Sequence, residues 1–104
     1  MSFLPSTVGV GSFDAPFSYV RAILGEPIYK KGYENHVYKS DVVWQIFMQV
    51  DPIEIVTVYN YKDGKNYLGE KGLKPEQITH WCIGSNNKEK ARLYISKRLN
   101  VEIE

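Results

Sequence analysis

The sequence predicts a small α+β domain, in which an antiparallel meander of three to four strands has one helix before it and one after it. Three observations support this fold class. Residues 41–50 alternate between apolar and polar side chains, as in a strand with one buried face. A second run, rich in β-branched residues, follows at 53–61. Helical spacing of apolar residues is found near both ends of the chain, at 14–24 and 87–99.

Length and composition limit the class of protein. A chain of 104 residues corresponds to one domain, which we place at 14–104, after an irregular arm at 1–13. The 43% hydrophobic and 24% charged residues are ordinary for a folded protein, and the net charge of +1 argues against a DNA-binding protein. Cys82 is the single cysteine, no apolar run is long enough to span a bilayer, and the N-terminus lacks the basic segment of a signal peptide. We therefore expect a cytoplasmic protein without a membrane partner.

The first helix has recognisable start and stop signals. Asp14 is a candidate N-cap, and Pro16 is tolerated in the first turn, where its missing N–H costs nothing. Apolar residues recur at helical spacing through 17–24, and Gly25 followed by Pro27 ends the run. We therefore expect a short helix that packs on the sheet.

The strands at 41–50 and 53–61 form the centre of the expected meander. The apolar face of the first strand consists of Val42, Trp44, Ile46, Met48 and Val50. Asp51-Pro52 indicates a turn, and both faces of the second strand are fairly apolar. Such a strand is either central in its sheet or covered by a partner, so we expect a homo-oligomer, a dimer or a tetramer.

The segment after the second strand contains an Asp63-Gly64 pair, which is the strongest short-range signal for a β-hairpin with a type I′ turn. We therefore predict a return strand at 65–68 and a further strand at 78–83. Ser85 or Asn86 is the expected cap of the last helix, and the tail at 100–104 is expected to be frayed or a short edge segment.

The residues that could support catalysis form a weak set. His80 and Cys82 lie two residues apart on an expected strand and so project to one face, but no third group is placed to orient them. A thiol between two large apolar residues is more often a core residue than a nucleophile. With His36 as the only further imidazole, the ligands are too few for structural zinc. We expect no enzyme activity, no metal and no cofactor.

A binding site is better supported, by two separate patterns. The start of the last helix directly follows a strand and offers free N–H groups to an anion, while Lys88 and Arg92 lie at i and i+4. The alternative for this pattern is a normally capped helix with a solvated basic face. The tyrosines around Asp63-Gly64 could stack on a flat base, and the alternative is an ordinary hairpin with cross-strand tyrosine pairs.

Together the two patterns favour a nucleotide-type ligand. In this hypothesis aromatic rings stack on bases, Asn60 or Asn66 reads a base edge, and lysines with the helix start hold phosphates. The candidate ligand-binding residues are Tyr59, Asn60, Tyr61, Lys62, Lys65, Tyr67, Trp81, Gly84, Ser85, Asn86, Lys88 and Arg92.

Two motifs give the chain a family resemblance. The run Tyr59-Asn60-Tyr61-Lys62-Asp63-Gly64-Lys65-Asn66-Tyr67-Leu68-Gly69, and downstream Ile78-Thr79-His80-Trp81-Cys82-Ile83-Gly84, resemble a group of small bacteriophage proteins. The likeness spans about residues 25–99, and it is identified with the phage anti-CBASS nucleotide sponges. Ser85 stands where a glycine is common in that group, and the ligand contacts of the family are not matched position by position.

The resemblance implies a phage-encoded protein of immune evasion. Such a sponge binds a cyclic dinucleotide signal of bacterial anti-phage defence in an oligomer and withholds it, uncleaved, from host effectors in the host cytoplasm. The alternative is a protein–protein inhibitor, in which the aromatic segment docks on a host defence protein without a small ligand. A third class, a structural or regulatory accessory protein, also fits the composition.

Overall fold

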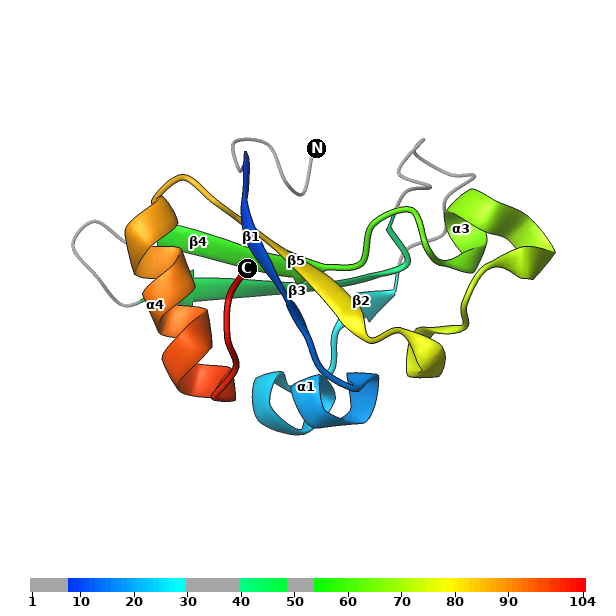
Figure 1. The fold of residues 1–104 in the computed structure, drawn as a ribbon, viewed down its shortest axis with the longest axis horizontal. Coiled ribbons are helices and arrows are strands. Elements are labelled where there is room, and N and C mark those ends of the chain that lie inside the picture. The colour runs from blue at the N-terminus through cyan, green and yellow to red at the C-terminus, as the bar shows by residue number, and fades with distance from the viewer. Residues whose placement is uncertain (1–7, 30–39, 49–53) are drawn as a thin grey trace.

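The structure, a computed structural model, describes residues 8–29, 40–48 and 54–104 (Figure 1). Its centre is a five-stranded antiparallel sheet with the strand order β1-β5-β4-β3-β2. The strands are β1 (Val8–Asp14), β2 (Ile28–Tyr29), β3 (Val42–Met48), β4 (Glu54–Tyr59) and β5 (His80–Ser85). The helices are α1 (Phe17–Leu24), α3 (Lys65–Leu68) and α4 (Lys88–Leu99), with 3-10 turns η1 (Gly69–Lys71) and η2 (Pro75–Gln77). The predicted α+β class is confirmed.

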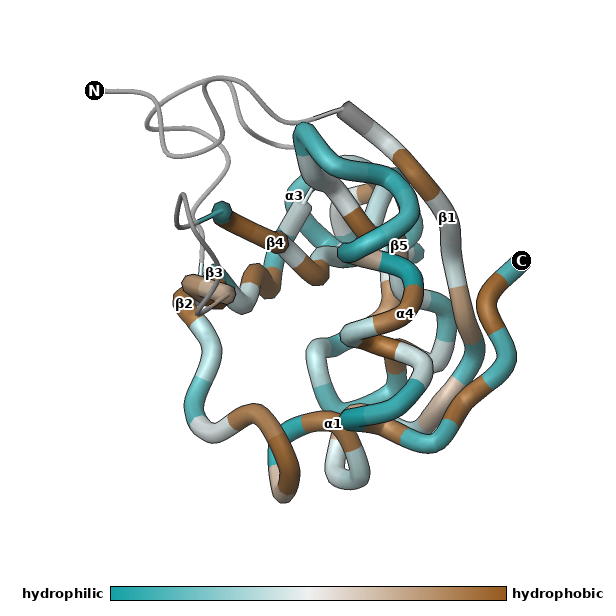
Figure 2. The backbone as a smooth tube through the Cα atoms, turned by 90° about the vertical axis from the view of Figure 1, so that its left-hand side faces the viewer, coloured by the Kyte–Doolittle hydropathy of each residue, from teal (hydrophilic) through white to brown (hydrophobic). Residues whose placement is uncertain are grey.

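The expected central strands are confirmed, and their alternation determines where the core lies. On β3, Trp44 and Met48 point to one face and are buried; opposite Trp44 stands Val58 of β4, and opposite Val58 stands Ile83 of β5. Helices α1 and α4 add their buried residues to the same cluster, so both cover this one face. Figure 2 shows the strands and the two helices in the view turned by 90°. The residues 49–53, with the expected Asp51-Pro52 turn, lie outside the described part.

Three large rings join the sheet to α1 at the middle of this core. Trp44 and Trp81 meet edge to face with their centroids 5.1 Å apart, and Phe17 packs at 5.8 and 6.2 Å from the two indoles. Each buried indole N–H has an acceptor, because Trp44 donates to Gly25 O (2.7 Å) and Trp81 to Ala15 O (2.9 Å). These bonds tie both ends of α1 to the sheet without leaving a buried donor unpaired.

The first strand corrects the expectation of an irregular arm. Residues 8–13, placed in that arm, belong to β1, which pairs antiparallel with β5 through Phe13 and Trp81, among other residues. The glycines that suggested irregularity sit at a register shift between Gly9 and Gly11, as in a β-bulge. The pairing partner is far away in sequence, so no local pattern indicated it. With β1 and the two-residue β2, the sheet has five strands rather than three or four.

The two main helices begin and end close to the predicted positions, but their caps differ. Asp14 does not cap α1; its carboxylate lies 2.8 Å from His80 Nδ1, and the residue before the helix is Pro16. In α4 the cap is Asn87, whose side chain accepts from Lys90 N at 3.1 Å. Asn100 ends α4 in the left-handed conformation, which asparagine tolerates better than most residues.

The C-terminal tail forms an edge segment, one of the two predicted outcomes. Ser12 N donates to Glu104 O at 3.2 Å, and Glu104 N donates to Ser12 O at 2.7 Å. The tail therefore lies along the edge of β1 that does not face β5, and it pairs with backbone groups of β1 that would otherwise be unpaired.

Candidate functional site

The predicted ligand-binding residues are divided among three places. Those around Asp63-Gly64 lie in and before α3, at one end of the long axis of the molecule; those near residue 88 begin α4, at the other end (Figure 1). The remainder lie between them, Trp81, Gly84 and Ser85 buried in β5 and Tyr59 half-buried at the end of β4. A single chain therefore does not combine the two predicted half-sites into one pocket.

At the α3 end, a buried asparagine holds the backbone. Asn60 is fully buried, and its Oδ1 accepts from the backbone N–H groups of Asp41 (2.7 Å) and Val42 (2.9 Å). Its Nδ2 donates to the carboxylates of Asp41 (3.2 Å) and Asp63 (3.0 Å). Asp41 Oδ2 in turn accepts from Asn66 N at 3.0 Å. Because its side-chain groups are used in this way, Asn60 is not available to read the edge of a base.

The hairpin predicted from Asp63-Gly64 is wrong. Gly64 has φ −99° and precedes α3, so residues 65–68 form a helical turn and not a return strand. The residue with positive φ is Lys62, at 62°. Gly64 is needed for another reason, since a Cβ there would collide with the Asp41 carboxylate. The glycine serves a close approach of two chain segments, which local sequence does not distinguish from a turn.

The residues 60–68, here named the tyrosine loop, present two rings and a lysine to solvent. The Lys62 Nζ lies 5.2 Å from the Tyr61 ring centroid and 5.6 Å from that of Tyr67, within cation–π range. Tyr61 and Tyr67 are 46% and 41% exposed, and Lys65 is also exposed. Three predicted residues, Tyr61, Lys62 and Tyr67, therefore remain together on one accessible surface, while Lys65 Nζ donates to Glu70 O at 3.3 Å.

The predicted residues of β5 are interior. Trp81 has no exposed face, because Trp44 and Phe17 pack against it, and Gly84 and Ser85 are also buried. Tyr59, opposite Cys82 on the neighbouring strand, is half-buried, and burial is the first cause that raises the pKa of its phenol. Neither Trp81 nor Gly84 presents a surface to a ligand in this structure.

The start of α4 is a normally capped helix. Ser85 Oγ accepts from Asn87 N at 3.0 Å and donates to Asn87 O at 3.5 Å, so this predicted ligand-binding hydroxyl is directed to the chain. Asn86 and Lys88 are exposed. Arg92 faces the C-terminal tail and donates to the backbone carbonyls of Val10 (2.9 Å), Glu104 (3.0 Å) and Ile103 (3.2 Å). The guanidinium expected to bind phosphate is thus engaged in joining the tail to β1.

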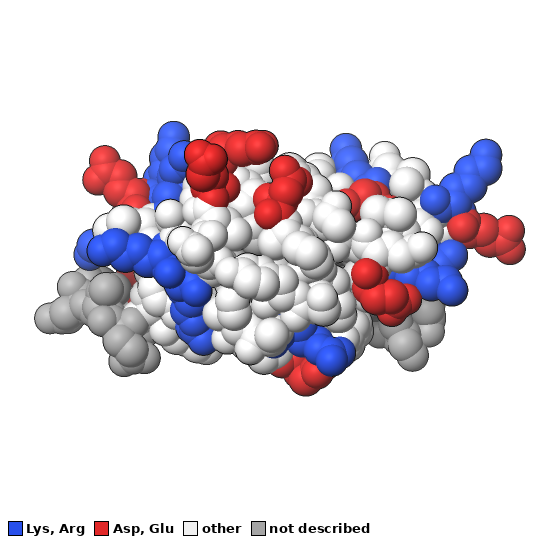
Figure 3. Space-filling view, turned by 60° about the horizontal axis from the view of Figure 1, so that its bottom comes forward, with Lys and Arg blue, Asp and Glu red and all other residues white. Residues whose placement is uncertain are grey.

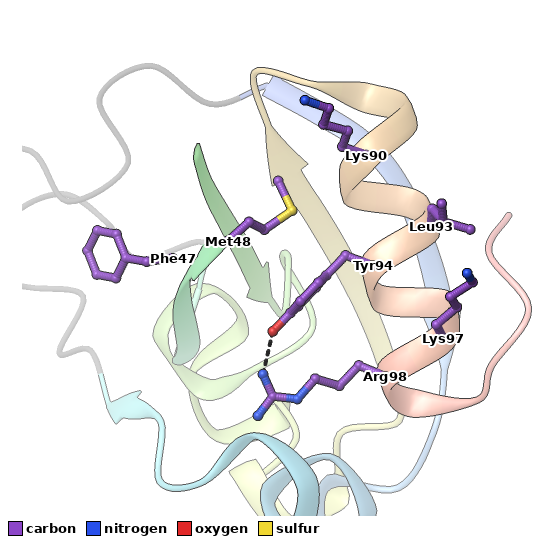
Figure 4. Close-up of a pocket in the computed structure, with 7 residues that line it drawn as sticks. All are labelled: Phe47, Met48, Lys90, Leu93, Tyr94, Lys97 and Arg98. Atoms are coloured by element: carbon purple, nitrogen blue, oxygen red, sulfur yellow. Dashed lines mark hydrogen bonds between the residues drawn. The ribbon is translucent and has the colours of Figure 1, made fainter. Parts of the chain in front are cut away.

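A concave surface that the sequence did not predict lies between α4 and the end of β3. This α4 groove has a volume of about 620 Å³. Its apolar lining comes from Phe47, Met48, Leu93 and Tyr94, and three cations surround it, Lys90, Lys97 and Arg98 (Figure 4). Arg98 donates to the Tyr94 hydroxyl and to Ile23 O. The residues at 90, 93, 94, 97 and 98 share one helix face, which is the signal that could have revealed the groove.

Charge on one face of the molecule is mixed. Figure 3 shows side chains of both signs around the rim of one face and an uncharged band across its middle. The groove differs, because each charged residue described as lining it is a cation.

His80 and Cys82 show no sign of acting as a pair. His80 is hydrogen-bonded to Asp14, while the pKa of the half-buried Cys82 thiol is raised, first by burial and second by Asp63. A raised pKa disfavours the nucleophilic thiolate. Among the described residues there is no group of three or more His, Cys, Asp or Glu that could hold a metal.

Searches against protein-family models, curated proteins and solved structures found no match. Within the described part of the chain, every helix is too short or too polar to cross a bilayer.

Proposed function

We propose that the protein is a non-catalytic binding protein that sequesters a nucleotide through its tyrosine loop. The observation that most supports this is the exposed cluster of Tyr61, Lys62 and Tyr67, in which an ammonium group lies within 6 Å of two aromatic rings. A nucleotide has the complementary parts, because a base can stack on a ring and a phosphate can pair with the lysine.

The loop is also suited to binding because its backbone is fixed in advance. The Asn60 and Asp41 network anchors both sides of the cluster, through Asp63 on one side and Asn66 on the other. A surface that is already ordered loses little conformational entropy when a ligand arrives.

The resemblance to phage nucleotide sponges favours a cyclic dinucleotide as the ligand and bacterial anti-phage defence as the setting. In this proposal the protein acts in the host cytoplasm as a dimer or tetramer and withholds the signal by mass action. Since Lys88 and the tyrosine loop lie at opposite ends of one chain, joint contact with a single ligand would require two subunits.

The test is calorimetric titration with a panel of cyclic dinucleotides, combined with light scattering to measure the mass of the assembly. Tyr61→Ala should weaken binding about fivefold or more, since one stacked base contributes about 1–3 kcal/mol. Lys62→Ala should also weaken it, through the lost charge-assisted contact with a phosphate. Phe47→Ala and Lys97→Ala are matched controls, an exposed aromatic ring and an exposed lysine in the α4 groove. They should leave the affinity unchanged.

Three results would contradict the proposal. Recovery of a cleaved nucleotide would identify an enzyme, and a monomer near 12.0 kDa would remove the oligomeric sponge. If no nucleotide binds and the protein still blocks a host defence system, the protein–protein inhibitor becomes the better account.

A further inference from the structure

We propose that the α4 groove is a docking site for a partner protein segment that carries apolar side chains between two groups of carboxylates. The first support is unpartnered apolar surface. Leu93 lines the groove and is 56% exposed, while Phe47, equally exposed, reaches only its rim because its ring is turned away from α4 (Figure 4). Exposed apolar surface in a concave site is typical of a recognition surface.

The apolar part of the groove is formed by two elements. Met48 of β3 is buried and points toward α4, where the Tyr94 ring stands beside it, while Phe47 points away and contributes at the rim (Figure 4). Met48 and Tyr94 both line the groove, and methionine adapts readily to the shape of a side chain that packs against it.

The cations around this apolar part are separated along the helix. Lys90 lies at one end of the groove and Arg98 at the other, with Lys97 beside it (Figure 4). Eight residues of helix separate Lys90 from Arg98, which corresponds to about 12 Å. A ligand that satisfies both ends must therefore carry negative charge at two places with apolar groups between them.

These charges are not neutralised by the described part of the chain. The ion pairs between described residues are Arg21–Glu26 and His80–Asp14, and neither involves the groove. Glu54 is the cross-strand neighbour of Met48 but is not among the residues that line the groove. Arg98 retains donors beyond the two it uses, because a guanidinium has five.

The presence of cations at both ends of the groove favours one class of ligand. A mononucleotide concentrates its charge on adjoining phosphates, and a bilayer presents a surface too broad to enter a groove. An acidic segment fits either as a helix with carboxylates eight residues apart or as an extended chain with carboxylates about four residues apart, at about 3.3 Å per residue. This surface lies at the opposite end from the tyrosine loop, so the inference does not rest on the nucleotide proposal.

The experiment is fluorescence polarisation with a fluorescein-labelled peptide that has glutamate pairs at both ends and Leu-Phe-Leu at its centre. Combined Lys90→Glu and Lys97→Glu should weaken binding about tenfold or more, and raising the salt should weaken binding to the native chain, since exposed charges are screened. Leu93→Ala should weaken it by about threefold to tenfold through lost apolar contact. Lys88→Glu is the matched control, on the same helix but outside the groove, and should change little.

Several outcomes would overturn the inference. One is equal binding of a peptide in which lysines replace the glutamates, and another is an equal loss for Lys88→Glu. Binding to phosphatidylserine vesicles with no binding to the peptide would indicate a membrane surface. Loss of cyclic dinucleotide binding in the Lys90 and Lys97 variant would make the groove the nucleotide site. Loss of nucleotide binding only in the Tyr61 variant would concern the tyrosine loop and leave this inference intact.

Discussion

The tyrosine loop and the α4 groove are both exposed, but different forces hold them. In the loop, buried polar groups of Asn60 and Asp41 fix the backbone, and aromatic rings remain outside. Beside α4, apolar packing of Ala91, Ile95 and Leu99 fixes the helix, and cations remain outside. A polar network has few acceptable geometries, whereas apolar packing tolerates adjustment. We therefore expect the loop to be rigid and selective and the groove to be adaptable.

The largest effect would disrupt both regions at once. Trp44→Ala removes a buried ring that contacts Phe17 and Trp81, so it should lower the free energy of unfolding by roughly 3–5 kcal/mol. Urea unfolding measures this change. Tyr29→Ala, which removes an exposed ring from the edge strand, is the control and should change stability by at most about 0.5 kcal/mol. A Trp44 variant that unfolds like the native chain would show that this ring is not part of the core.

A second change would affect the loop and spare the groove. Asn60→Ala leaves the N–H groups of Asp41 and Val42 without their acceptor, at a cost of roughly 2–4 kcal/mol. Binding at Tyr61 should be lost with it, while binding in the α4 groove should persist at temperatures where the variant is folded. Asn86→Ala, at an exposed position, is the control and should unfold like the native chain. Equal stability of the two variants would show that the network does not hold the loop.

A third change separates α4 from the tail. Arg92→Ala removes hydrogen bonds to the carbonyls of Val10, Ile103 and Glu104, and should cost about 1.5–3 kcal/mol because the donor is charged. Arg92→Lys should recover part of this stability, since a lysine keeps the charge but lacks the planar set of donors. Hydrogen exchange should become faster at the backbone amides of Ser12 and Glu104. Unchanged exchange there would contradict the assigned role.

The smallest expected effect concerns Cys82 in β5, between the tyrosine loop and the α4 groove. The pKa of Cys82 is raised above its ordinary value of 9.0, so iodoacetamide should alkylate the native thiol more slowly than the thiol in urea. Since the folded chain favours the neutral thiol, its contribution to stability is present below the unfolded pKa and is lost as the pH rises through the folded pKa. The native rate should therefore rise with pH over a higher range than the rate in urea. Equal rates in the native and unfolded chains at about pH 8 would falsify this prediction.

The sequence alone was sufficient where the signal is periodic. The alternation around Trp44 identified β3 and its buried face, and the spacing of Ala91, Ile95 and Leu99 identified α4. Both patterns record burial directly, because each residue's position along a regular element determines the side it faces. The α+β class followed from these elements without knowledge of any contact between them.

Tertiary structure decided what depends on contacts between distant segments. Strand β1 exists because β5 pairs with it, and Gly64 is a glycine because the Asp41 carboxylate lies against it. Contacts between distant segments also explain why Arg92, expected at an anion site, binds backbone carbonyls instead. They likewise bring Met48 and Tyr94 together in a groove. Residue types such as tyrosine, lysine and arginine serve ligands and the chain equally well, and only the position of their partners in space determines which of the two they serve.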